Sequence, residues 1–168
     1  MSILINDQEA FVSLTGGMVD AIVRAPDRET FLEVARTVEL YYEVMETVTD
    51  PDTGETSQVG TGEWQVGKGI NIDHLGSVVI TPGTYDEDGN ELTAPVMDNR
   101  HHVNIRLAPP ATEKLDDNGN PKWHGWAVAW TQNGQPDPDV NATEEARVYN
   151  QVALIDPDSI NTPTRVWA

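Results

Sequence analysis

The sequence predicts a single α+β domain that is mainly β, with one helix near residues 28–38. That helix would cover an antiparallel β-sandwich or curled sheet formed by about residues 39–168. Three observations favour this fold: one segment has helical periodicity and a cap, several later segments alternate as strands do, and Asp-Gly or Asn-Gly turns separate them. A length of 168 residues fits one domain, in which residues 1–38 form an N-terminal helical segment and residues 39–168 a β-rich body.

The helix is predicted from its start signals and its apolar spacing. Asp27 is placed to accept hydrogen bonds from the free amides of the first turn, and Glu29 complements the helix dipole. Phe31, Ala35 and Val38 then recur at helical spacing. Residues 40–48 alternate and predict a strand. Upstream, residues 18–24 fit either a strand or a second helix, after a break at Gly16-Gly17.

The β-rich body is predicted from strands joined by polar turns. Alternation is clearest at residues 100–107, where His101, Val103 and Ile105 share one face with Leu107 and predict a half-buried strand. The turns are expected at residues 50–54, 86–90, 116–120 and 133–134. Further strands are predicted at residues 77–81, 123–131, 152–156 and 165–167, and a short helix at residues 141–149.

The segment 123–131 carries three tryptophans. As a strand it would place Trp126 and Trp130 on one face with His124. Such a face is either part of the core or an exposed surface for a sugar or a protein partner, and an obligate interface would satisfy both readings.

Two sequence motifs suggest ligands but are explained by local structure. Residues 62–69 have the spacing of a phosphate-binding loop, but Gly69 stands where Ser or Thr would hold magnesium, and the following residues are strand-like. The acidic turn at residues 86–91 offers several oxygen ligands, but its register is wrong for a calcium-binding EF-hand. We therefore expect neither a nucleotide nor a metal cofactor.

The four histidines do not form a recognisable catalytic pattern. His101 and His102 are neighbours on a predicted strand and should point to opposite faces. Asp73 and His74 are a conceivable orienter and base, but no serine nucleophile motif accompanies them. The sequence thus predicts a protein that is not an enzyme.

Composition excludes several further classes. There are 28 acidic and 10 basic residues, a formal charge of −18, which argues against direct binding of nucleic acid through a basic patch. The absence of cysteine excludes disulfides and thiolate metal sites. No apolar stretch is long enough for a membrane span or a signal peptide, so we expect a protein that is neither secreted nor membrane-anchored.

The acidic charge is concentrated in one stretch. Between Arg36 and Lys68 there is no basic residue, although seven acidic residues lie there. A field of this sign would either mimic DNA and block a nucleic-acid enzyme, or keep subunits soluble before assembly and repel nearby DNA.

Residues 71–106 and 154–168 resemble small virion proteins of tailed bacteriophages, which are acidic, cysteine-free and β-rich. The resemblance implies a structural subunit of the particle, made in the cytoplasm of the host bacterium, with the tail or baseplate favoured over head decoration or head–tail joining. It would act by self-association and by docking on other virion proteins. The alternatives are an acidic inhibitor that mimics nucleic acid, and a small carbohydrate-binding or hydrolytic module.

Interface roles are expected at both termini and on the tryptophan face. Apolar termini on so charged a chain should be covered by a partner. The predicted interface residues are Ile3, Leu4, Ile5, Trp126, Trp130, Val166 and Trp167.

Overall fold

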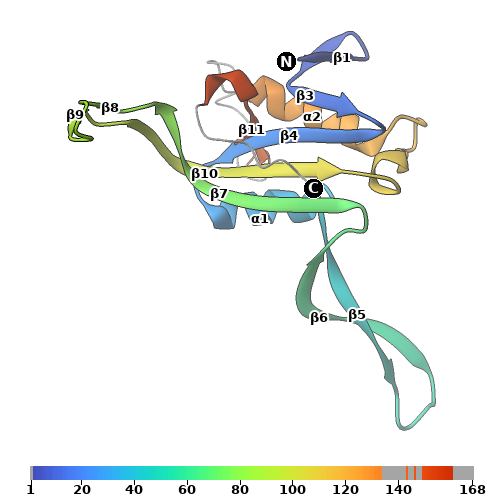
Figure 1. The fold of residues 1–168 in the computed structure, drawn as a ribbon. Helices are drawn as coiled ribbons and strands as arrows, with labels where there is room; N and C mark the ends of the chain where they lie inside the picture. Colours follow the sequence, from blue (N-terminus) through green and yellow to red (C-terminus); the bar gives the residue numbers. More distant parts are fainter. Residues whose placement is uncertain (1, 134–142, 144–145, 147–148, 161–168) are drawn as a thin grey trace.

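The fold is known from a computed structural model, which describes residues 2–133, 143, 146 and 149–160. Its body is an antiparallel sheet in the order β11-β4-β10-β7, with β3 also paired to β4 (Figure 1). The strands of this sheet are β3 (Val12–Thr15), β4 (Met18–Ala25), β7 (Ile70–Thr81), β10 (Val96–Leu107) and β11 (Ala153–Leu154).

The predicted α+β, mainly β class is confirmed. In the described part of the chain the other sheets are two-stranded hairpins, and it is helices that pack on the five-stranded sheet. The hairpins pair β1 (Ile3–Ile5) with β2 (Gln8–Ala10), β5 (Tyr41–Thr49) with β6 (Thr56–Val66), and β8 (Thr84–Tyr85) with β9 (Glu91–Thr93). Two short 3₁₀ turns, η1 (Ala111–Glu113) and η2 (Pro157–Ser159), complete the described elements.

The predicted helix is confirmed as α1 (Arg28–Thr37). The Asp27 carboxylate accepts a hydrogen bond of 2.8 Å from the backbone N–H of Thr30, as expected for its cap. Phe31, Val34 and Ala35 are buried against the sheet. Local signals therefore sufficed for this element.

The N-terminal segment contains more strand than the sequence predicts. Residues 18–24, which fit either a strand or a helix, form most of β4. β4 lies at the centre of the sheet, hydrogen-bonded to β10 from Val19 to Ala25. Two strands from the first 38 residues, β3 and β4, are therefore part of the same sheet as the strands of the later body.

The strand predicted at residues 123–131 is wrong, because this segment belongs to helix α2 (Lys122–Asn133). The buried side chains are Trp123, Trp126 and Trp130, with Ala127 and Thr131, and their spacing is helical. Alternate positions in so short a run also fit a strand, which is why sequence periodicity misled.

The core lies on one face of the sheet. Val103, Ile105 and Leu107 of β10 pack there with their β4 partners, against α1 and α2. The predicted half-buried face of β10 is thus confirmed, and the strand extends N-terminally to Val96. His102 is buried on the opposite face, where the register between β10 and β7 shifts.

Of the remaining predicted strands and helix, some are confirmed and others lie outside the described residues. The strand at 40–48 is confirmed as β5, the strand at 77–81 lies within β7, and the one at 152–156 shortens to β11. The helix predicted at 141–149 lies largely outside the described residues, and the strand at 165–167 lies outside them entirely.

Candidate functional site

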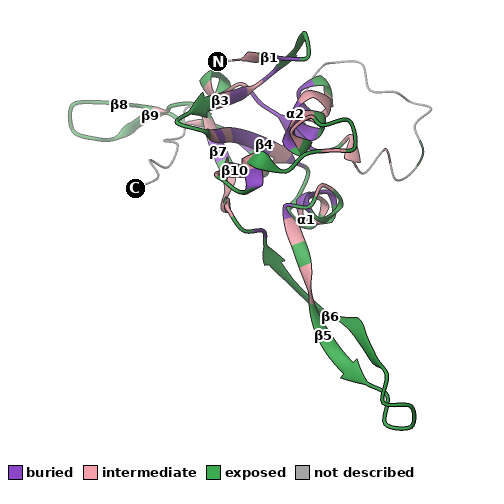
Figure 2. Ribbon diagram, turned by 90° about the vertical axis from the view of Figure 1, so that its right-hand side faces the viewer, coloured by how far each residue is buried: buried purple, intermediate pink, exposed green. Residues whose placement is uncertain are grey.

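The most distinctive feature of the molecule is the β5–β6 hairpin, residues 41–66, which we call the arm. Figures 1 and 2 show it projecting away from the body. Every residue of β6 is exposed, and β5 has no buried residue. Among the described residues no further strand pairs with the arm, so both of its edges carry backbone groups without a strand partner there.

A bulge in the middle of the arm is held by an acidic side chain. The register shifts between Glu43 and Met45, opposite residues 60–64. The Glu43 carboxylate accepts a hydrogen bond of 2.9 Å from the Gly62 backbone, and the Thr61 hydroxyl donates one of 2.9 Å to the Val44 carbonyl. Glu43 also covers Gly60 so closely that a Cβ there would lie 2.4 Å from its carboxylate. Side-chain hydrogen bonds of Glu43 and Thr61 therefore fix the position of the bulge.

The distal half of the arm exposes apolar side chains on both faces. Val48 and Val59 share one face, because Val48 pairs with Ser57 and Val59 with Glu46. Met45 lies on the other face. These three side chains are 42%, 45% and 51% exposed, respectively. Within the described part of the chain, no layer of the protein covers either face here.

The arm is acidic throughout. Its six carboxylates are Glu43, Glu46, Asp50, Asp52, Glu55 and Glu63, and it has no basic residue. We call residues 50–55 the tip. Asp50 is used within the tip, where it accepts hydrogen bonds from the backbones of Asp52 and Thr53, and hydrogen bonding lowers its pKa. The Asp52 and Glu55 side chains project into solvent.

The root of the arm is fixed to the body. Gly67 donates a backbone hydrogen bond of 3.0 Å to Leu40, whose side chain is buried. The Arg36 guanidinium lies 4.8 Å from the ring centroid of Trp64, a cation–π contact between α1 and β6. The arm therefore leaves the body in a defined direction.

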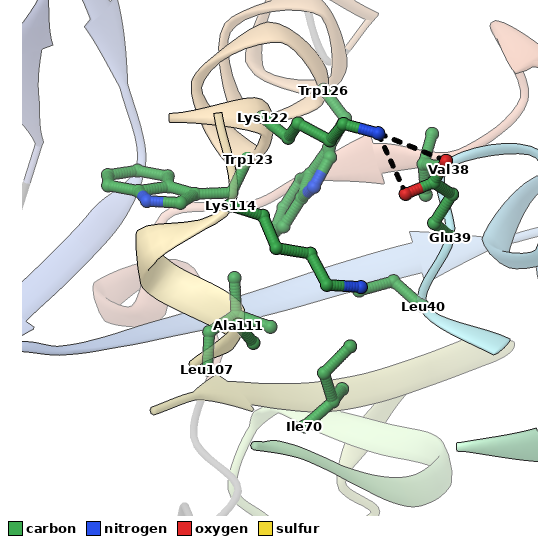
Figure 3. A pocket seen from close by; sticks show the side chains of 10 residues that line it. All are labelled: Val38, Glu39, Leu40, Ile70, Leu107, Ala111, Lys114, Lys122, Trp123 and Trp126. Carbon is green, nitrogen blue, oxygen red and sulfur yellow. Dashed lines mark hydrogen bonds and ion pairs between the residues drawn. The ribbon is translucent and has the colours of Figure 1, made fainter. Parts of the chain in front are cut away.

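A small cleft lies next to this root, between residues 38–40 and α2 (Figure 3). Lys122 bridges its mouth with an ion pair of 3.0 Å to Glu39, and Lys114 lies across its centre. Trp126 and Leu40 line its apolar wall. Its volume is about 20 Å³, room for roughly one water molecule, so it serves packing and not ligand binding.

A second hairpin lies at the opposite end of the body. Figure 1 shows β8 and β9 continuing from the far ends of β7 and β10. This end also exposes large apolar side chains on the hairpin and beside it: Ile80, Tyr85, Leu92, Val96 and Met97. The molecule therefore presents apolar surface at both ends.

Close to this second end, Asp98 is surrounded by cationic side chains. Arg100 donates two hydrogen bonds to its carboxylate, of 2.8 and 2.7 Å, and Arg24 lies 3.8 Å away. Hydrogen bonding from Arg100 lowers the pKa of Asp98 to about 2. His102 is within 3.5 Å on the buried side. The group carries more positive than negative charge at neutral pH.

The histidines are only partly brought together. His74 and His101 share a hydrogen bond of 2.8 Å between Nδ1 and Nε2, next to Phe31. Burial lowers the pKa of both rings, so both are neutral at pH 7. His102 lies on the other face of β10, as predicted, and His124 is on α2. Among the described residues no three histidine or carboxylate side chains are grouped to hold a metal ion.

The two motifs take the local structures expected of them. Gly67–Gly69 form the turn between β6 and β7, and a strand, not a helix, follows them. In the acidic turn, Asp86 accepts hydrogen bonds from the backbones of Asp88 and Asn90. These carboxylates are therefore used to close turns.

The predicted interface residues differ in how far they are buried. Trp126 and Trp130 are 5% and 0% exposed within the chain's own core, so the structure removes both from any surface. The prediction of a surface role failed because the segment is a helix facing the sheet. Ile5 is likewise buried and Ile3 partly so, whereas Leu4 is 74% exposed. Val166 and Trp167 lie outside the described residues.

The apolar residues of the arm were missed by sequence reasoning. The base-free acidic run pointed to this hairpin, but Met45, Val48 and Val59 look like ordinary strand residues. A usable signal was that acidic residues interrupt both faces of the strand, leaving neither face apolar enough for a core.

No protein-family model matches the chain, and no match was found among curated proteins or solved structures. Within the part of the chain that is described, neither helix has the length and apolar character needed to cross a membrane.

Proposed function

We propose that this protein is a structural subunit of a tailed-bacteriophage particle, in its tail or baseplate. It acts without turnover, by self-association and by docking on other virion proteins. The observation that carries the proposal is the arm, an ordered two-stranded hairpin with apolar side chains exposed on both faces.

The arm is only weakly stabilised when no partner contacts it. A two-stranded hairpin is marginally stable alone in water, because it lacks a buried face to offset its loss of conformational entropy. Here the anchored root supports only its base. Contact with a partner would bury Met45, Val48 and Val59 and satisfy an edge strand.

The partner we infer is a second copy of the chain. The arm combines apolar and acidic side chains, and the opposite end combines apolar side chains with the Arg24 and Arg100 guanidiniums. Two different surfaces at opposite ends favour head-to-tail contacts, which close into rings or extend as filaments. Rings and filaments are both arrangements that repeated structural subunits form.

The assignment to a bacteriophage rests on the resemblance of residues 71–106 and 154–168 to virion proteins, together with the acidic, cysteine-free composition. The charge of −18 fits a subunit that must stay soluble until it assembles. A nucleic-acid mimic would also use acidic side chains, but the exposed apolar residues between them favour a protein partner over a copy of a phosphate backbone.

Light scattering coupled to size-exclusion chromatography tests the proposal. We expect the purified chain to form a ring or polymer as salt screens its charge, for example on going from about 0.01 to 0.15 M, where the screening length falls from about 30 to 8 Å. Replacing Val48→Thr and Val59→Thr together should abolish the large species while preserving strand propensity.

The control replaces two leucines away from the arm that are somewhat more exposed than the valines, Leu14→Thr and Leu115→Thr, and should assemble normally. A protein that stays monomeric at every salt and concentration would overturn self-association. Assembly that survives the arm substitutions would show that another surface is used.

A further inference from the structure

A cleft beside the Asp98 cluster has the charge and size of a carboxylate-binding site. Its volume is about 200 Å³, several times that of a water molecule, and it opens between the end of β4, β10 and the segment before β11. Arg24 and Arg100 line it with Asn150 and Gln151, whose amide groups are additional donors. Asn133 builds its rim by donating to the Tyr149 and Val152 carbonyls.

Both guanidiniums have N–H donors that Asp98 does not use. Asp98 takes the Nε and Nη2 donors of Arg100, whereas the one ion pair of Arg24 within the described residues is the 3.8 Å contact to that same carboxylate. One carboxylate thus balances two guanidinium charges. Burial lowers the pKa of Arg24, and the neighbouring Arg100 lowers it further, because a second positive charge is unfavourable there. An incoming carboxylate would relieve this repulsion.

The arm and this cleft lie at opposite ends of α1. Ala25 and Pro26, which line the cleft, come just before the helix, and the arm begins at Tyr41 just after it. A helix of 10 residues spans about 15 Å, and the 9 residues of β5 carry the tip about 30 Å farther on. Figure 1 shows the arm projecting from the body at the end opposite the β8–β9 hairpin, so its tip points away from the cleft of the same molecule.

We propose that the Arg24–Arg100 cleft receives the acidic tip of the arm of a neighbouring copy, through Asp52 and Glu55. This inference rests on the proposed self-association and specifies how it occurs. The exposed Val96 and Met97, near the same end, then face the apolar side chains of the incoming arm. The contact is heterologous, so each copy uses one arm and one cleft.

A charge-swap experiment tests the contact. The tip variant Asp52→Lys with Glu55→Lys reverses the ligand, and the cleft variant Asn150→Asp with Gln151→Glu adds two negative charges without touching the Arg100–Asp98 pair. Each variant alone should associate at least about tenfold more weakly than the wild type in about 0.15 M salt. An equal mixture should regain association, because the basic tip fits the acidic cleft.

The control variant Glu113→Lys with Asp117→Lys changes the net charge as much as the tip variant does, at exposed positions away from both surfaces. It should associate as the wild type does. Circular dichroism melting should show all variants folded. If the mixture fails to recover, or if the cleft variant associates normally, the tip–cleft contact is overturned.

Cross-linking separates failure of this contact from failure of self-association. The chain has no cysteine, so Thr53→Cys at the tip and Gln151→Cys at the cleft can be placed in separate molecules and mixed under oxidising conditions. A disulfide-linked heterodimer, absent when Asp117→Cys replaces the cleft partner, supports the contact. Large species without this cross-link would overturn the tip–cleft contact alone. Monomers without it would overturn the contact and the proposed self-association together.

Discussion

The body and the arm are built from similar strands but meet opposite environments. In the body, β4 and β10 pair over seven residues and bury one face under two helices. In the arm, β5 and β6 pair over a comparable length, yet β6 is exposed at every position (Figure 2). Strand pairing therefore does not by itself indicate where stability resides, and side-chain burial separates the folding core from a surface suited to assembly.

Replacing one tryptophan in the body and one in the arm should reveal the largest difference in stability between the two regions. Trp130→Ala removes a fully buried indole and should lower the free energy of unfolding by about 3–5 kcal/mol. Trp64→Ala, at the base of the arm, removes a side chain that is 39% exposed and a cation–π contact worth about 0.5–1 kcal/mol.

Urea denaturation of the monomer measures both changes, and Trp130→Phe is the milder variant if the alanine form does not fold. Equal losses of unfolding free energy for Trp64→Ala and Trp130→Ala would show that the arm is part of the cooperative core.

Two glycines with similar backbone angles extend the comparison. Gly69, in the body, has φ +78°, and a Cβ there would lie 2.4 Å from the Ala108 carbonyl oxygen. Gly62, in the arm, has φ +80° with open space around it. Alanine costs about 1–2 kcal/mol at either position from the left-handed backbone alone. We expect Gly69→Ala to cost more than this in thermal melts, since backbone must also shift.

Gly62→Ala should cost less than its intrinsic strain when global unfolding is measured, because the arm can loosen without unfolding the body. Hydrogen exchange at the arm amides would show that local loss. A larger global effect at Gly62 than at Gly69 would contradict the comparison.

The sequence could predict what local chemistry specifies. The α1 helix follows from the Asp27 cap and apolar spacing, and three Asp-containing turns follow from side chains that bond their own backbone. Residues 123–131 of α2 were predicted as a strand, because the apolar pattern of these nine residues fits both the strand period and the helical period. The acidic run of the arm was visible in the sequence, but the Arg24–Arg100 cleft was not, because its two arginines meet only through the long-range pairing of β4 with β10.

Acidification should destabilise the body through the His74–His101 pair. Both rings have a lowered pKa in the folded state, caused first by burial, with Arg28 nearby and Asp27 and Asp73 opposing it. The unfolded state therefore binds more protons once the pH falls below about 6.5, the ordinary histidine pKa. Stability is fully present above that value and decreases as the pH falls toward the lowered folded values.

The measurement is urea denaturation at about pH 7.5 and pH 5.5, before most carboxylates titrate. The double variant His74→Gln with His101→Gln should lose much of this dependence, while His124, whose pKa burial also lowers, retains a share. The Tyr41 hydroxyl, 3.5 Å from His74, links the pair to the arm root. An unchanged pH dependence in the double variant would locate the sensitivity elsewhere.

The smallest effect is expected on the arm itself. In the monomer, Val48→Thr with Val59→Thr should change the free energy of unfolding by no more than about 0.5 kcal/mol per site, because both side chains lie on the surface and outside the core. Thermal melting at low salt and low concentration checks this. A loss of several kcal/mol would mean that these valines stabilise the isolated fold. Near-zero change in the monomer, together with loss of the assembled species, would place their contribution in the contact between copies.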